Sequence, residues 1–191
     1  RMSRGLGDVY KRQSFFINNG AIFADIMESR NIITAREMVY DHNWLVPTMN
    51  GELRLEKPPL PTWIAAITEM ISPDNLPLQR AMAGFAAVML VLFFYKFATK
   101  LTDNRTYALV SSLVLCTSYN IILMGRTATW DIYCHAFMMG AIYYLYLALR
   151  QNPCKWTYFI GAGIFMGLSF LGKGPVSFYA LPVSYTHLTL P

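Results

Sequence analysis

Residues 81–98 read AMAGFAAVMLVLFFYKFA, an apolar block in which Lys96 is the only charged side chain. A helix crosses a bilayer with about 20 mainly apolar residues, and with fewer where a nearby Lys extends its ammonium group to the interface. Three further blocks of this kind follow: 107–124, 132–149 and 156–172. Another begins after Pro175. The sequence therefore predicts an all-α polytopic membrane protein with a helical bundle over residues 80–182.

The composition agrees with this class. Hydrophobic residues make up 54% of the chain, aromatic residues 15% and charged residues 14%, whereas soluble domains carry about 25% charged residues. Residues 1–13 contribute +3 of the net charge of +5, so the remainder carries +2. No basic stripe with interleaved aromatic residues is left, and we therefore expect no binding of nucleic acid.

The two ends differ from the rest of the chain. Residues 1–13 (RMSRGLGDVYKRQ) and 183–191 (VSYTHLTLP) resemble translated adapter sequence, and we interpret both as non-native. The alternative for residues 1–13 is a genuine basic cytoplasmic tail. Residues 14–17 are interpreted as the last turn of a first span whose beginning is absent. On this interpretation the chain is an amino-terminal fragment cut inside a span at each end.

Charges between the apolar blocks predict an orientation. Cations gather in two connections, with Lys96, Lys100 and Arg105 in one and Arg150 and Lys155 in the other. Residues 18–79 instead hold four cations against eight acids, a net of −4. By the positive-inside rule the basic connections are cytoplasmic. The acidic segment and the turns at 125–131 and 173–175 then share the outer face, which is periplasmic in a bacterial inner membrane.

The outer segment, residues 18–79, is predicted to have internal order. Apolar residues at helical spacing over 28–40, with acids near the start, predict an amphipathic helix on the membrane surface. Trp44 lies in a turn-rich stretch and suits an interfacial anchor. A second short helix is predicted over 61–71. We expect the segment to cap the spans; the alternative is a solvated linker.

Three groups of residues resemble the outer loops of membrane glycosyltransferases related to 4-amino-4-deoxy-L-arabinose lipid A transferase and the dolichyl-phosphate-mannose protein mannosyltransferases. The first contains TAREMV (34–39), NWLVP (43–47), NGE (50–52), LEKPPL (55–60) and Trp63; the others are GRT (125–127) through Asp131 and LGKGP (171–175). Their order and spacing match. The resemblance implies a C-type glycosyltransferase fold, of which this chain is only the amino-terminal part.

The resemblance also implies an activity. Such an enzyme moves a sugar from a polyprenyl-phosphate-linked donor to a lipid A, protein or other glycan acceptor at the outer membrane face. The sugar and the acceptor are not identified by the sequence. The alternative is a transporter or a non-catalytic lipid-binding scaffold. The charged residues gather at one membrane face rather than at the bilayer midplane, and this favours the enzyme. We expect the fragment itself to be inactive, because half a cavity cannot hold the donor.

Cleavage of a glycosyl phosphate leaves negative charge on phosphate oxygens, and fixed cations stabilise that charge. Lys57 suits this role as a point charge, held by the two prolines that follow it, and Arg30 as a planar fork. Arg126 and Lys173, in the other two matched turns, complete the predicted phosphate-binding set. The alternative for Lys57 is an interfacial cation that only extends toward water.

A hydroxyl acceptor needs a carboxylate to take its proton. Asp25, Glu28 and Asp131 are the candidates on the outer face. The family pattern has an Asp-Glu pair before the Arg matched by Arg30, whereas this chain has Met27-Glu28 there, so either Asp25 takes over the role or the base lies elsewhere. Asp131 could equally cap the following helix.

A divalent metal is possible at one position. Glu56 resembles a family residue that can touch such an ion. One carboxylate without His or Asp at ligand spacing is weak support, however. We therefore expect no obligatory metal.

Overall fold

The computed structural model describes residues 15–20, 23–150 and 155–175. Helices α2 (Ile26–Tyr40) and α3 (Leu60–Ile71) precede five further helices: α4 (Leu76–Thr102), α5 (Arg105–Thr117), α6 (Tyr119–Arg126), α7 (Asp131–Arg150) and α8 (Trp156–Lys173). Strands β1 (Thr48–Met49) and β2 (Glu52–Leu53) form a small hairpin. The two segments interpreted as non-native, together with Ser14 and the apolar block after Pro175, lie outside the described residues.

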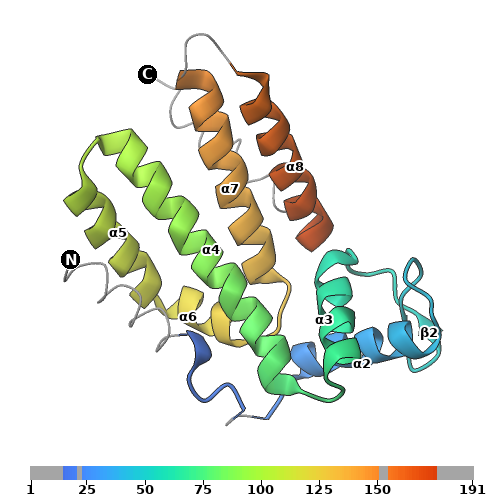
Figure 1. Cartoon of the computed structure of the whole chain (residues 1–191). Coiled ribbons are helices and arrows are strands. Elements are labelled where there is room, and N and C mark those ends of the chain that lie inside the picture. Colours follow the sequence, from blue (N-terminus) through green and yellow to red (C-terminus); the bar gives the residue numbers. More distant parts are fainter. Residues whose placement is uncertain (1–14, 21–22, 151–154, 176–191) are drawn as a thin grey trace.

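The long helices stand side by side, and the short outer helices lie at one end of them (Figure 1). α7 packs against both α4 and α8, while α5 and α6 pack against α4. Within the described residues, α4 and α7 are each long and apolar enough to cross a membrane. The pair α5–α6 is a third candidate if it is counted as one span.

α4 is longer than the apolar block that predicts it. It begins after Asn75, whose side-chain oxygen accepts a hydrogen bond from the Leu78 N–H at 3.0 Å. Pro77 fits the first turn, where its missing N–H leaves no bond unmade. At the other end Asp103 adopts a left-handed conformation (φ 51°) and ends the helix. Capping therefore extends the helix beyond residues 81–98 at both ends.

The span predicted over 107–124 is not one straight helix. α5 and α6 are bent by 62° at a break between them. Ser118, at the break, has an extended backbone (φ −60°, ψ 129°). The Thr117 hydroxyl donates to the carbonyls of Leu113 and Val114, and such bonds to the preceding turn often bend helices.

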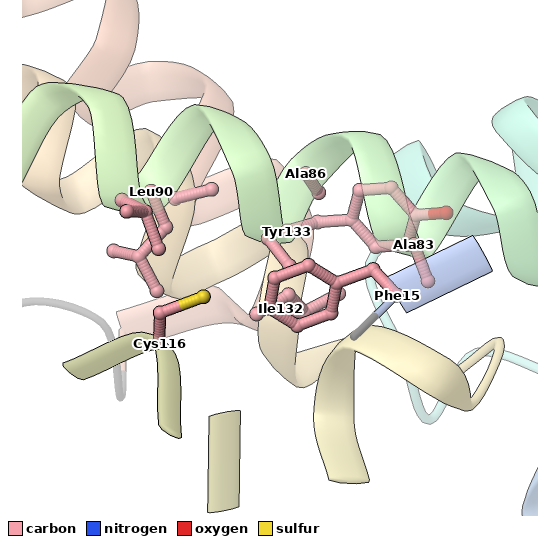
Figure 2. Packing of buried hydrophobic residues seen from close by; sticks show 10 residues of the cluster. Phe15, Ala83, Ala86, Leu90, Cys116, Ile132 and Tyr133 are labelled. Carbon is pink, nitrogen blue, oxygen red and sulfur yellow. The ribbon is translucent and has the colours of Figure 1, made fainter. Parts of the chain in front are cut away.

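The bundle core is closely packed around Phe15 (Figure 2). Phe15 and Ala83 are fully buried, as is Ile132 at the start of α7. A Cβ atom at Gly125 would lie 2.7 Å from Cδ1 of Phe15, so the ring requires glycine there. Gly125, in one of the three matched motifs, thus has a packing role.

The outer segment forms a structured layer in which α2 packs against α3. The predicted second helix is present as α3. The predicted first helix begins at Ile26, and its buried residues include the polar side chains of Glu28, Asn31 and Thr34. Trp44 packs against the buried cluster between α2 and α3, and its carbonyl accepts a hydrogen bond from the Trp63 indole N–H at 2.8 Å.

The hairpin is attached to α2 by one carboxylate. Asn50 and Gly51, with φ of 55° and 78°, make the tight turn for which positive φ is required. Glu37 accepts hydrogen bonds from the Thr48 hydroxyl and the N–H groups of Asn50 and Gly51. Burial acts to raise the pKa of Glu37, but these three bonds hold it below its usual value of 4.5. The short matched motif Asn50-Gly51-Glu52 is therefore a turn fixed to α2.

Candidate functional site

Trp130, directly before α7, joins the polar loop to the bundle. The Arg54 guanidinium carbon lies 5.4 Å from the centroid of the Trp130 ring, and the Lys57 ammonium nitrogen lies 5.8 Å from it. Both distances fall within the range of attraction between a cation and an aromatic face. The ring is 5% exposed, whereas Lys57 is exposed. A rigid buried ring thus supports a cation that solvent can reach.

Asp131 and Lys173 form an ion pair between the first residue of α7 and the last residue of α8. Their side chains are 32% and 33% exposed. A Cβ atom at Gly174 would lie 3.8 Å from Cγ of Pro58. The three matched motifs, far apart in sequence, therefore meet in space, as their predicted common face requires.

Arg54 is a component that sequence reasoning missed. It is 8% exposed and donates to the Arg30 carbonyl at 2.7 Å and to the Thr34 hydroxyl at 2.6 Å. Burial lowers the pKa of Arg54, the Glu56 charge raises it, and the Arg30 charge lowers it further. Arg54 thus links α2 to the Trp130 ring. Its place three residues before Lys57, in a matched loop, was the only signal in the sequence.

Arg30 and Glu56 lie at the edge of this cluster. Both side chains are exposed. Their charges act on Arg54 in opposite directions, which places one cation and one carboxylate near the guanidinium. Within residues 15–20, 23–150 and 155–175, no group of three or more His, Cys, Asp or Glu side chains could hold a metal ion. The metal role of Glu56 stays a weak hypothesis.

Glu28 lies in a buried network. Its carboxylate receives Nε and Nη2 of Arg80 at 2.9 and 2.7 Å, the Ala128 N–H at 2.7 Å and the Asp25 N–H at 3.1 Å. Burial alone would raise the pKa of Glu28, but these hydrogen bonds and the Arg80 charge hold it below 4.5. The carboxylate ties α2 to α4 and to the turn that carries Trp130.

Arg80 was not a predicted site residue, although it completes that network. It also donates through Nη1 to the Asn19 carbonyl at 2.6 Å, and it is 4% exposed. Nothing in the sequence indicates this partner for Glu28, since 52 positions separate the two.

We call Trp130, Arg54, Lys57, Asp131 and Lys173, with Arg30 at their edge, the Trp130 cluster. Asp25 and Arg126 make their contacts elsewhere. Asp25 precedes α2, and its side chain is exposed. Arg126, the last residue of α6, donates through Nη2 to the Ile17 carbonyl at 2.6 Å. The structure thus gathers Lys57, Arg30, Asp131 and Lys173 around Trp130 and Arg54, and it gives Arg126 a contact with the segment before α2.

This arrangement suits an anionic group. The Arg54 and Lys57 cations both lie over the Trp130 ring. Fixed charges of this kind stabilise the negative charge that develops during a reaction. The Trp130 indole N–H is buried and has no hydrogen-bond partner among the described residues. An unsatisfied buried donor costs about 1–3 kcal/mol, so an acceptor on a bound molecule would offset that cost.

Comparisons with known proteins place these motifs in context. Residues 56–190 match the family model described as dolichyl-phosphate-mannose-protein mannosyltransferase. The match covers Lys57, Asp131 and Lys173, and it extends into residues 183–190, whose non-native origin stays a prediction.

Several curated relatives match most of this chain. Undecaprenyl phosphate-alpha-4-amino-4-deoxy-L-arabinose arabinosyl transferases of Yersinia enterocolitica and Shewanella sediminis are 29% and 32% identical over 160 and 162 residues. Each alignment covers 82% of this chain but only 28% or 29% of the relative. The chain thus spans less than a third of the length of these proteins.

Solved structures match the fold. Crystal structures of ArnT from Cupriavidus metallidurans, one in the apo state and one bound to undecaprenyl phosphate, each give a TM-score of 0.78 at 18% identity. Each match covers 98% of this chain and 35% of the ArnT chain.

Proposed function

Because this chain belongs to the dolichyl-phosphate-mannose-protein mannosyltransferase family, we propose that it is part of an integral membrane enzyme that transfers a sugar from a polyprenyl-phosphate carrier. Its architecture is the helical C-type glycosyltransferase fold, in part, which confirms the fold and the family predicted from the outer-loop motifs. The names of the relatives support undecaprenyl phosphate as the carrier. The acceptor is lipid A, a protein or another glycan.

The meeting of Lys57, Trp130 and the Asp131–Lys173 pair carries this proposal. The Lys57 ammonium is exposed but supported by the indole ring, so it can meet a phosphate without a large loss of side-chain freedom. Lys173, a third exposed, offers a second cation on the neighbouring helix end. Arg54 is held by Arg30 and Thr34 and adds positive potential behind the ring.

The chemistry follows from these charges. The bond between the sugar carbon and the phosphate oxygen breaks, its electron pair stays on the phosphate, and Lys57 and Lys173 stabilise the resulting charge. The acceptor oxygen forms the new bond to the sugar carbon. When Lys173 turns toward the phosphate, Asp131 loses its partner and can accept the proton of a hydroxyl acceptor.

The remaining carboxylates differ in their suitability as the base. The Asp25 side chain is exposed, so it stays a candidate. Glu28 receives four hydrogen bonds while 1% exposed, which favours a positioning role over proton transfer.

We assign the cluster to the outer, periplasmic face. The cluster and the basic connection after α4 lie at opposite ends of a helix of 27 residues, a length of about 40 Å at 1.5 Å per residue. The positive-inside rule then places the cluster outside.

The proposal is tested with Lys57→Met in the full-length protein, assayed in proteoliposomes with a radiolabelled polyprenyl-phosphate sugar. We expect transfer to fall by about 10²-fold or more, the loss typical of a lost charge-stabilising group. Lys155→Met, at an exposed cation before α8, is the matched control and should retain transfer within twofold.

Membrane insertion and the thermal midpoint are measured for both variants. Normal turnover by Lys57→Met would remove this lysine from the site. Donor binding without transfer by the unmodified protein would instead favour the scaffold over the enzyme.

A further inference from the structure

A second polar site lies at the far end of α4 from Arg80. An open cavity of about 270 Å³ is formed by the end of α4, the start of α5 and the facing side of α7; it is lined by Tyr95, Lys96, Thr99, Lys100, Arg105 and Tyr143. α4 and α5 meet at this end of the bundle (Figure 1). Arg80 and Lys100 are 20 positions apart on one helix, which corresponds to about 30 Å, the thickness of a hydrocarbon core. The cavity thus lies at the interface opposite the Trp130 cluster.

The lining is positively charged. It contains three cations and no acid. Among the described residues, none of these cations has a carboxylate oxygen within 4.0 Å, and the nearby Asp103 pairs with Arg150 at 3.6 Å. Three like charges around one cavity repel each other, and an anion placed between them relieves that repulsion.

The walls are fixed by contacts between helices. The Lys100 carbonyl accepts the Tyr146 hydroxyl at 3.0 Å and also Nη1 of Arg150, which attaches the last turns of α4 to α7. Phe93, one turn before Lys96, packs its ring against Tyr143 with centroids 6.0 Å apart. The Lys96 ammonium lies 5.9 Å from the same Phe93 ring. The cations are therefore presented by packed helix ends.

We propose that this cavity binds the phosphate group of an anionic phospholipid in the leaflet opposite the transfer site. The shared chemistry is a phosphate monoanion, for which lysine and arginine are the usual partners. A lipid is favoured over free phosphate because exposed side chains with large apolar surfaces are close in sequence to lining residues. Leu101, next to Lys100, is 55% exposed, and Tyr107, two residues after Arg105, is 60% exposed. Basic cavities between membrane helices commonly bind such headgroups.

The test is lipid retention by the purified full-length protein, measured by native mass spectrometry after detergent exchange. The probes are phosphatidylglycerol, phosphatidylcholine of the same chain length, and inorganic phosphate as a competitor. The test variant is Lys100→Gln. Lys155→Gln removes one exposed positive charge from the same membrane face, outside the cavity, and is the matched control. Lys100→Arg keeps the charge.

We expect Lys100→Gln to weaken phosphatidylglycerol binding by about fivefold, the contribution of one basic residue near an anionic lipid. Lys155→Gln and Lys100→Arg should stay within twofold of the unmodified protein, and inorganic phosphate should not displace the lipid. Because Lys100 is exposed, the thermal midpoint of each variant should stay unchanged.

Three results would overturn the proposal. Equal losses in Lys100→Gln and Lys155→Gln would show an unspecific attraction of the basic face. Equal retention of phosphatidylcholine would remove the role of the charge. Displacement by millimolar inorganic phosphate would assign the cavity to a soluble anion. None of these results bears on transfer, so the outcome is independent of the proposed enzyme activity.

Discussion

Two ion pairs lie at the same end of the bundle and differ in almost every physical respect. In the pair of Arg80 with Glu28 the side chains are 5% and 1% exposed, and the carboxylate receives further backbone hydrogen bonds. In the pair of Lys173 with Asp131 the exposures are 33% and 32%. The first pair joins α4 to α2, and the second joins the facing ends of α7 and α8.

This difference separates support from chemistry. A buried pair with every oxygen occupied cannot exchange partners without a large cost in free energy. A partly exposed pair is held loosely and can exchange one partner for a ligand. We infer that Glu28 and Arg80 hold the Trp130 turn in place, while Asp131 and Lys173 are available to donor and acceptor.

The largest effect should follow from breaking the buried pair. Arg80→Ala leaves the Glu28 carboxylate buried without its cation, and we expect a loss of about 3–5 kcal/mol in the free energy of unfolding. Denaturant titration in mixed micelles measures this change. Adding Glu28→Gln to Arg80→Ala should recover part of the loss, because the uncompensated charge is then removed.

The matched control is Arg150→Ala. Arg150 pairs with Asp103 at 3.6 Å, and the two side chains are 54% and 78% exposed. We expect a loss of about 1 kcal/mol or less. Similar losses for Arg80→Ala and Arg150→Ala would show that burial does not distinguish the pairs.

Lowering the pH should reduce the free energy of unfolding by a smaller amount. The folded state holds the pKa of Glu28 below the usual 4.5, so the unfolded chain binds this proton first as the pH falls. The stability from this group is therefore full above pH 4.5 and is lost as the pH falls through the lowered folded pKa. The loss should be smaller than in Arg80→Ala, since the carboxyl group still fills its site.

The pKa of Glu37 is also lowered in the folded state, so this group too loses its contribution to stability as the pH falls. We call the acidic part of the curve of stability against pH the acid limb. Unfolding curves of Glu28→Gln and Glu37→Gln between pH 3 and pH 7, at about half-unit steps, separate the two. Each variant should show a flatter acid limb than the unmodified protein. An unchanged limb in Glu28→Gln would mean that the buried pair does not depend on the charge of this carboxylate.

Hydropathy predicted the positions of the bundle helices but not the ends of α4 or the bend between α5 and α6. The predicted block 132–149 agrees closely with α7 (Asp131–Arg150), because its apolar run ends at charged residues. The hydropathy of block 107–124 did not predict the bend at Ser118, since a single extended residue barely alters the mean hydropathy of an apolar run. Local backbone conformation, which composition does not report, determined the difference.

The candidate site was predictable where it lay in motifs and obscure where it depended on packing. Lys57, Asp131 and Lys173 could be proposed because their three turns matched a family in order and spacing. Trp130 was not singled out, because an aromatic residue at a membrane–water interface ordinarily indicates an interfacial anchor. Arg80 was not recognised either, since its partner is known only once α2 and α4 are in contact.

The smallest change in stability should come from the exposed pair, and it gives the sharpest comparison. In Lys173→Met we expect the free energy of unfolding to change by about 1 kcal/mol or less, because solvent screens the pair. The same variant should lose transfer from the polyprenyl-phosphate donor by about 10²-fold, since one charge that we propose stabilises the phosphate is gone. Lys155→Met should alter neither quantity. Had Lys173 only a structural role, the two quantities would fall together, as they should in Arg80→Ala; a large loss of transfer at nearly constant stability is the result that assigns this pair to the chemistry.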